Sequence, residues 1–227
     1  MPAVAVATPS VPRQFQEWLQ QLYCLSPLAP VDAFLLEGKA SDGPTETLLL
    51  REHSNALELG LYLDPDVVAR LEARGGIANF AGQSLEDFWT VLEGVSHFVC
   101  LGWHAERDRE ISALDLEIQA EIDKYVTAWE FARQSGLNGL AEPLYRQLFE
   151  RWRPASGAES PLGERYRRAN AFAAIYCRHL LSAHPDNSLD VRSELRDFFR
   201  LPPQRRRERI HAVTRPHGGA WPPPGVR

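Results

Sequence analysis

The stretch SLEDFWTVLEGVSHFVCLGWHAE (residues 84–106), followed by RDREI (107–111) and SALDLEIQAEIDKYVTAWEFARQ (112–134), decides the fold. In both long segments apolar residues recur at the three- and four-residue spacing of an amphipathic helix. Ser84 and Ser112 are suited to cap the two helices, because a serine hydroxyl accepts a hydrogen bond from an early backbone N–H. Since the linker is short, we predict an antiparallel helical hairpin.

Four polar residues of this hairpin could hold a metal ion. Glu93 and His97 are four residues apart, so their side chains are neighbours on the first helix. Glu121 falls inside the apolar stripe of the second helix and Glu117 at its edge, where an unpaired buried carboxylate costs several kcal/mol. In the antiparallel hairpin the two pairs would face each other. The pattern predicts a Glu/His site for a divalent metal, with Glu121 as a candidate catalytic acid or base.

A purely structural interpretation of the same residues stays open. Glu121 could pair with Lys124 or with an arginine, and His97 could lie at the edge of a hydrophobic core. The Glu-x-x-His spacing of di-iron bundles is absent, because three residues separate Glu93 from His97. The sequence therefore allows either a metal site or a set of structural ion pairs.

Upstream of the hairpin the pattern is mixed. RQFQEWLQQLYC (13–24) predicts a short amphipathic helix, and residues 64–75 predict a second, with proline in its first turn and glycine after its end. Between them lie three strand-like runs, at residues 33–37, 46–52 and 56–63. The last run alternates leucines with polar or small residues, which is typical of an antiparallel strand with one covered face. Residues 13–80 therefore predict an α/β module with a three-stranded antiparallel sheet.

The rest of the chain divides by composition. We expect a helical bundle core at 81–152, a linker or loop in the Pro-, Ser- and Gly-rich segment 153–163, and an Arg-rich helical segment at 164–212. Disordered tails are expected at 1–12 and 213–227. The predicted fold class is α+β, mainly α: a small antiparallel meander with flanking helices, followed by a helical bundle.

Charge is distributed unevenly along the chain. Residues 1–150 carry 10 Lys and Arg against 23 Asp and Glu, whereas residues 151–227 carry 15 Arg against 7 acidic residues. Such separation indicates either that the two halves dock on each other or that each faces a different partner. Head-to-tail association into a homodimer would use the same complementarity.

A stripe of arginines is the second candidate for a functional surface. Its members, together with a tryptophan in the Pro-rich tail that resembles a short linear binding motif, are Arg192, Arg196, Arg200, Arg205, Arg206, Arg207, Arg209 and Trp221. Arginine clusters bind phosphates in nucleic acids, but acidic residues interrupt this stripe and no nucleic-acid-binding motif accompanies it. Binding to the acidic half or to another protein is favoured over binding to nucleic acid.

Composition and the absence of known motifs narrow the classes of protein to which the chain could belong. The 227 residues are 44% hydrophobic, typical of a globular protein, and no stretch is apolar enough to span a membrane. Three widely spaced cysteines fit reduced thiols in a cytoplasmic protein. No Walker, Rossmann, HExxH or EF-hand motif is present. We therefore predict a cytoplasmic accessory protein that binds another protein as an adaptor, assembly factor or regulator. The alternatives are an enzyme or sensor with the Glu/His metal site and a nucleic-acid-binding regulator.

Overall fold

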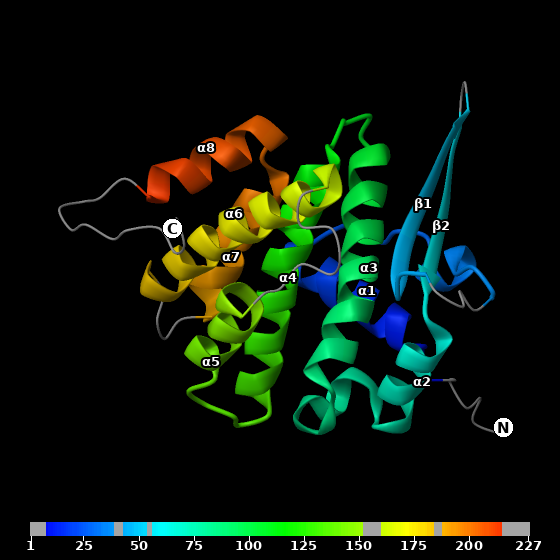
Figure 1. The fold of residues 1–227 in the computed structure, drawn as a ribbon, viewed down its shortest axis with the longest axis horizontal. Helices are drawn as coiled ribbons and strands as arrows, with labels where there is room; N and C mark the ends of the chain where they lie inside the picture. The colour runs from blue at the N-terminus through cyan, green and yellow to red at the C-terminus, as the bar shows by residue number, and fades with distance from the viewer. Residues whose placement is uncertain (1–7, 39–42, 54–55, 152–159, 184–187, 215–227) are drawn as a thin grey trace, which may run out of the picture.

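Two long antiparallel helices form the centre of the molecule. The computed structural model describes residues 8–38, 43–53, 56–151, 160–183 and 188–214. Helices α3 (Leu85–Ala105) and α4 (Ala113–Gln134) lie side by side, as Figure 1 shows. The hydroxyls of Ser84 and Ser112 accept hydrogen bonds from the backbone N–H groups of Asp87 and Asp115. These caps confirm the predicted helical hairpin.

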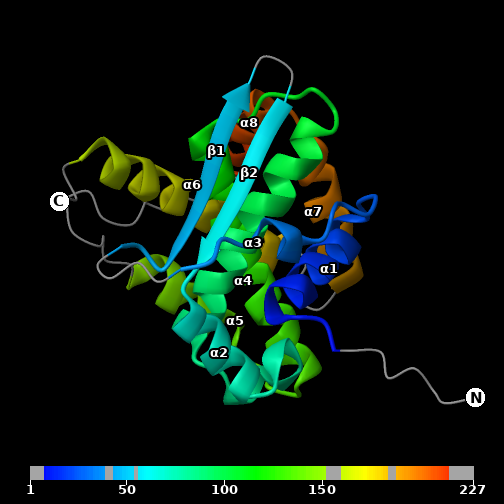
Figure 2. The same cartoon turned by 90° about the vertical axis from the view of Figure 1, so that its right-hand side faces the viewer.

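The other elements surround this hairpin (Figures 1 and 2). The β-hairpin and α2 pack on α3, α6 packs along α4, α1 lies against α3 and α7, and α8 packs on α6. The remaining bounds are α1 (Val11–Tyr23), η1 (Val31–Phe34), β1 (Glu46–His53), β2 (Ala56–Leu63), α2 (Pro65–Ala73), η2 (Gly76–Gly82), α5 (Ala141–Tyr145), η3 (Arg146–Glu150), α6 (Pro161–Ala183), α7 (Ser188–Arg200) and α8 (Pro203–Val213). The fold is α+β and mainly α, as the sequence predicts. Among the described helices, none is both long and apolar enough to cross a membrane.

The sheet has two strands among the described residues, whereas the sequence predicts three. β1 and β2 pair in antiparallel register, and Leu61 and Leu63 of β2 are buried against α3. The strand predicted at 33–37 is wrong. Val31 and Phe34 are three residues apart, so the 3-10 turn η1 places both apolar side chains on one side. After this turn, Leu35 makes a single parallel bridge to Leu61.

Several element boundaries also differ from the expected ones. Helix α1 begins at Val11, inside the segment expected to be a disordered tail, and α6 begins at Pro161, inside the expected linker. The last part of the expected bundle core at 81–152 consists of the short α5 followed by the π-helical turn η3. Residues 1–7, 152–159 and 215–227 lie outside the described part of the chain, which includes most of the predicted linker and of both predicted tails.

The acidic and basic parts of the chain dock on each other. Ion pairs between the described residues join arginines after residue 150 to carboxylates before it, among them Arg165–Glu117, Arg178–Glu142, Arg192–Glu130 and Arg207–Asp115. The N–O distances of these four pairs lie between 2.6 and 3.2 Å. The charge separation seen in the sequence therefore serves, at least in part, to hold α6, α7 and α8 against the rest of the fold.

The three cysteines are free thiols. Cys100 and Cys177 are buried, and Cys24 is exposed at the end of α1. Their unpaired state matches the reduced thiols that their spacing predicts.

Candidate metal centre between α3 and α4

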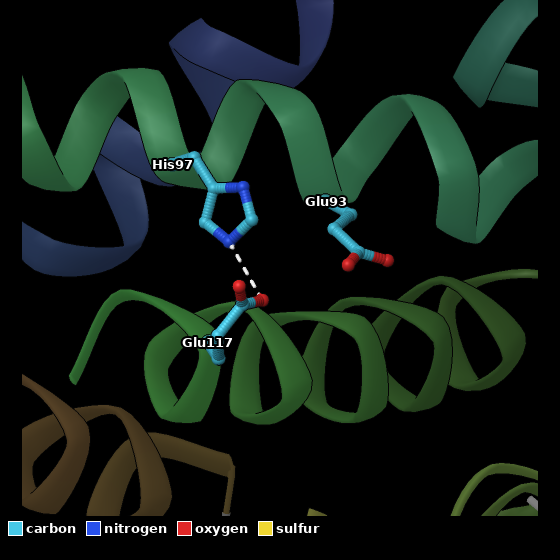
Figure 3. Close-up of side chains that lie close together, drawn as sticks. All are labelled: Glu93, His97 and Glu117. Atoms are coloured by element: carbon cyan, nitrogen blue, oxygen red, sulfur yellow. Dashed lines mark ion pairs between the residues drawn. The ribbon is translucent and has the colours of Figure 1, made fainter. Parts of the chain in front are cut away.

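Three of the four predicted metal ligands meet between the two central helices. Glu93 and His97 project from α3 toward Glu117 of α4 (Figure 3). One donor atom from each of the three lies within 4.8 Å of the other two. The Nε2 atom of His97 is 3.3 Å from an Oε atom of Glu117, and both side chains are buried. The four-residue spacing on α3 and the antiparallel partner helix together create this group.

Glu121, the fourth predicted ligand, is joined to the group through Lys124. The ammonium nitrogen of Lys124 lies 2.5 Å from Oε1 of Glu121 and 2.9 Å from Oε2 of Glu93. Glu121 and Lys124 are three residues apart on one face of α4. The predicted pairing of Glu121 with Lys124 is therefore confirmed, and its role as an acid or base stays a prediction.

The β-hairpin adds a carboxylate that the sequence analysis missed. Oε2 of Glu46, on β1, is 3.8 Å from Nδ1 of His97. Its approach depends on Gly94, since a Cβ atom at that position would lie 2.8 Å from Leu63 and 3.2 Å from Oε2 of Glu46. A glycine three residues before His97 was the available signal that another element comes close to this part of α3.

An arginine from α6 lies on the opposite side of Glu117. The Arg165 guanidinium donates a hydrogen bond of 3.2 Å to Oε1 of Glu117, whose other oxygen is near His97. Arg165 is 48 residues from Glu117 in the chain, so no local pattern predicts this contact. The cluster thus draws on four elements: β1, α3, α4 and α6.

The cluster perturbs the ionisation of its members. Burial alone would lower the pKa of His97, but the nearby carboxylates of Glu117 and Glu46 outweigh it and raise this pKa to about 10. Burial raises the pKa of Glu121, against the opposing effect of Lys124. For Glu93 the burial effect is outweighed by the charges of Lys124 and His97, so its pKa is lowered. Without a metal ion, His97 therefore carries a proton at neutral pH.

The cluster is incompletely satisfied. Buried oxygens of Glu46 and Glu121 have no hydrogen-bond partner, and the Nε2 atom of His97 has its 3.3 Å ion pair with Glu117 but no hydrogen bond of suitable geometry. The four carboxylates, of Glu46, Glu93, Glu117 and Glu121, carry four negative charges, and Lys124 and Arg165 carry two positive ones. Two negative charges remain, and a protonated His97 compensates only one of them.

A second buried polar group lies beside the first and has a different character. Asp123 accepts hydrogen bonds from Ser96 (2.6 Å), Gln119 (2.9 Å) and the Tyr23 hydroxyl. Burial raises the pKa of Asp123 to about 6, although these donors lower it in part. Because both carboxylate oxygens already accept hydrogen bonds, we interpret this group as a structural link between α1, α3 and α4.

The predicted arginine stripe is engaged within the molecule. Each of its seven arginines has an intramolecular partner: Arg192 with Glu130, Arg196 with the Leu22 carbonyl, Arg200 with the Tyr23 carbonyl, Arg205 with Glu208, Arg206 with the Phe199 and Leu201 carbonyls, Arg207 with Asp115, and Arg209 with Glu194. The stripe therefore lies over α1 and α4 as well as over its own helices. Trp221 lies outside the described residues.

Comparison with protein-family models, with curated proteins and with solved structures finds no match for this chain.

Proposed function

We propose that the protein binds one divalent metal ion between α3 and α4, with Glu93, His97 and Glu117 as ligands, and that it acts as a metal-responsive regulator or enzyme. The observation that carries the proposal is a set of one imidazole and two carboxylate donors, buried or half-buried, in a cluster whose carboxylates outnumber its lysine and arginine by two. A divalent cation supplies the missing charge, and its binding would replace the proton on His97.

The donor types narrow the choice of metal. One imidazole with two carboxylates suits zinc, iron or manganese, whereas calcium and magnesium prefer oxygen ligands alone. In a tetrahedral site, ligand distances of about 2.0–2.2 Å place the donor atoms about 3.3–3.6 Å apart. The donor atoms here lie up to 4.8 Å apart, so the side chains have to approach one another by about 1.2–1.5 Å to bind an ion. Three protein ligands would leave a position for water, which a bound metal makes more acidic.

The elements around the site support a regulatory role. Glu46 of β1 and Arg165 of α6 both contact the ligand set, so an ion there would alter the contacts of four elements at once. Binding of the ion would in this way change the positions of elements that reach the surface of the protein. An accessory protein whose binding to a partner depends on metal fits both this arrangement and the function predicted first from the sequence.

Elemental analysis tests the metal site directly. The protein is purified without chelator or metal-affinity tag and compared with Glu93→Ala/His97→Ala. A control variant, Glu106→Ala/His211→Ala, removes the same two residue types at exposed positions. We expect about one zinc, iron or manganese ion per chain in the wild type and the control, and less than a tenth of that in the site variant. A metal-free wild type that also takes up none of these ions on dialysis would contradict the proposal.

A second candidate function, protein binding through β1, rests on its outer edge. Leu36 donates a backbone hydrogen bond to the carbonyl of Leu61, which therefore points away from β1. Since Leu48 is directly opposite Leu61, the backbone N–H and C=O of Leu48 point away from β2. Among the described residues, no strand pairs with this edge, and Leu49 and Leu50 are 53% and 46% exposed. Such an edge is a template for another strand.

We propose a second copy of the chain as the occupant of this edge. Antiparallel pairing of two β1 strands about Leu49 places leucine opposite leucine at positions 48, 49 and 50. The same register places Glu46 of one copy opposite Glu52 of the other. Because like charges directly opposite each other repel, we expect the dimer to be weak. Sedimentation should show a concentration-dependent dimer that Leu49→Lys abolishes and that Leu189→Lys, at an exposed leucine of α7, leaves intact. A monomer at all concentrations would overturn this proposal.

A further inference from the structure

Lys124 occupies a position between two carboxylates that resembles that of a bound cation. Its ammonium nitrogen contacts one oxygen of Glu93 at 2.9 Å and one of Glu121 at 2.5 Å, and only 7% of the residue surface is exposed. Glu121 is likewise only 7% exposed, and its second oxygen is buried without a hydrogen-bond partner.

Glu93 belongs both to this pair and to the proposed metal ligands. One of its oxygens is held by Lys124, which leaves the other available to an ion beside His97 and Glu117. A carboxylate shared in this way between two cations is the usual bridge of two-metal sites, in which the ions lie about 3.5–4 Å apart. Here the ammonium group of Lys124 occupies one of the two cation positions.

We propose that Lys124 is a built-in second cation of the metal centre, which restricts the site to a single divalent ion, and that a neutral residue at position 124 would convert it into a two-metal site. This inference rests on the proposed function. Without the lysine charge, the four carboxylates and Arg165 leave three negative charges, one more than a single divalent ion compensates. Glu93 and the unpartnered oxygen of Glu121 would then be ligands for the second ion.

The inference also assigns a positioning role to Lys124. Because it holds one oxygen of Glu93, it favours binding of the ion by the other oxygen alone. A single ion with one-oxygen carboxylate ligands keeps coordination positions open. Two-metal chemistry, in which a pair of ions stabilises both attacking and leaving oxygens, would be excluded in the wild type.

The test compares Lys124→Met, which removes the charge at similar length, with Lys124→Arg, which retains it. Each metal-free protein is titrated with Mn²⁺ by calorimetry and followed by electron paramagnetic resonance. We expect one Mn²⁺ per chain for the wild type and Lys124→Arg. For Lys124→Met we expect two, with the spectrum of a spin-coupled pair. One Mn²⁺ per chain in Lys124→Met, or two in the wild type, would overturn the inference.

Folding of the variant is controlled separately, since Lys124→Met leaves two buried carboxylates without their cation. The double variant Lys124→Met/Glu121→Gln removes one of those charges and a ligand of the second ion. It should fold, bind a single Mn²⁺ and show no coupled spectrum. If Lys124→Met is unfolded without metal, the second ion should replace the lost charge and restore its circular dichroism at two Mn²⁺ per chain. Failure of Mn²⁺ to restore it would count against the inference.

The outcomes separate the two proposals. A wild type that binds no Mn²⁺ contradicts the metal site itself, and with it the role of Lys124. A wild type that binds one Mn²⁺, with Lys124→Met also binding only one, leaves the metal site standing and rejects the second cation position.

Discussion

His104 shows how the same side chain can serve different purposes on one helix. It lies two turns beyond His97 on α3 and is 1% exposed, with Nδ1 2.8 Å from the carbonyl oxygen of Cys100. Carboxylates surround His97 and favour its charged form, whereas burial, together with the charges of Arg206 and Arg109, lowers the pKa of His104. His104 is therefore a neutral core residue, and of the two histidines His97 is the one that lies among carboxylates.

The lowered pKa of His104 predicts that the stability of the fold depends on pH. The pKa of His104 is lower in the folded than in the unfolded state, so the unfolded state binds more protons as the pH falls below about 6.5. Stability from this residue is thus complete above the unfolded pKa and is lost as the pH falls toward the folded pKa. The part of the free energy of unfolding that His104 loses between pH 7 and pH 5 should be absent in His104→Gln. Urea unfolding at both pH values measures this free energy, and His211→Gln, at an exposed site on α8, is the control. Equal pH dependence in wild type and His104→Gln would contradict the assignment.

At the level of residues, the sequence predicts those contacts that arise within one helical hairpin. Glu93, His97 and Glu117 follow from a four-residue spacing and an antiparallel partner. Glu46 and Arg165 could not be predicted, because they reach the site from β1 and α6 through packing that no local pattern encodes. Gly94 was the one local sign of such a contact, and its meaning depends on which element approaches it.

Secondary-structure elements depend on tertiary contacts to different degrees. Helices α3 and α4 were predicted correctly because periodicity, capping and length agree. The segment at 33–37 has strand-like composition, yet the apolar pair of η1 packs better from a 3-10 turn, with Phe34 against Phe98. Helix α8 has little apolar surface to bury, and its position depends on arginines instead.

The docking of α8 can be tested with two neighbouring arginines. Arg207 contacts both oxygens of Asp115, at 2.7 and 2.9 Å, and Asp115 is 1% exposed. Arg205 pairs with the exposed Glu208 on its own helix. Arg207→Ala should lower the free energy of unfolding by about 2 kcal/mol, because it leaves a buried carboxylate without its cation. Arg205→Ala should change it by less than about 0.5 kcal/mol. Urea unfolding of the two variants distinguishes these values, and equal effects would contradict the inferred role of the Asp115 contact.

At the level of the whole molecule, internal charge pairing accounts for much of what the sequence suggested about partners. The acidic and basic parts were expected either to dock or to face separate partners, and sequence alone could not decide, because it gives no distances. The arginines of the stripe now have intramolecular partners. At the candidate metal centre, by contrast, the carboxylates outnumber the lysine and arginine paired with them by two, and the proton on His97 compensates only one of these charges. That residual charge is what distinguishes the centre from the structural ion pairs.

A site that joins elements from across the fold should couple metal binding to global stability. A ligand that binds only the folded state at 100 times its dissociation constant adds about 2.7 kcal/mol. At about 2–4 °C per kcal/mol for a chain of this size, the expected rise in Tm is about 5–10 °C. Calorimetric scans with and without Zn²⁺ or Mn²⁺ measure this rise, and a chelator should reverse it. Glu93→Ala/His97→Ala should show no rise, while Glu106→Ala/His211→Ala should behave as the wild type. An equal rise in the site variant would mean that the ion stabilises the fold from another position.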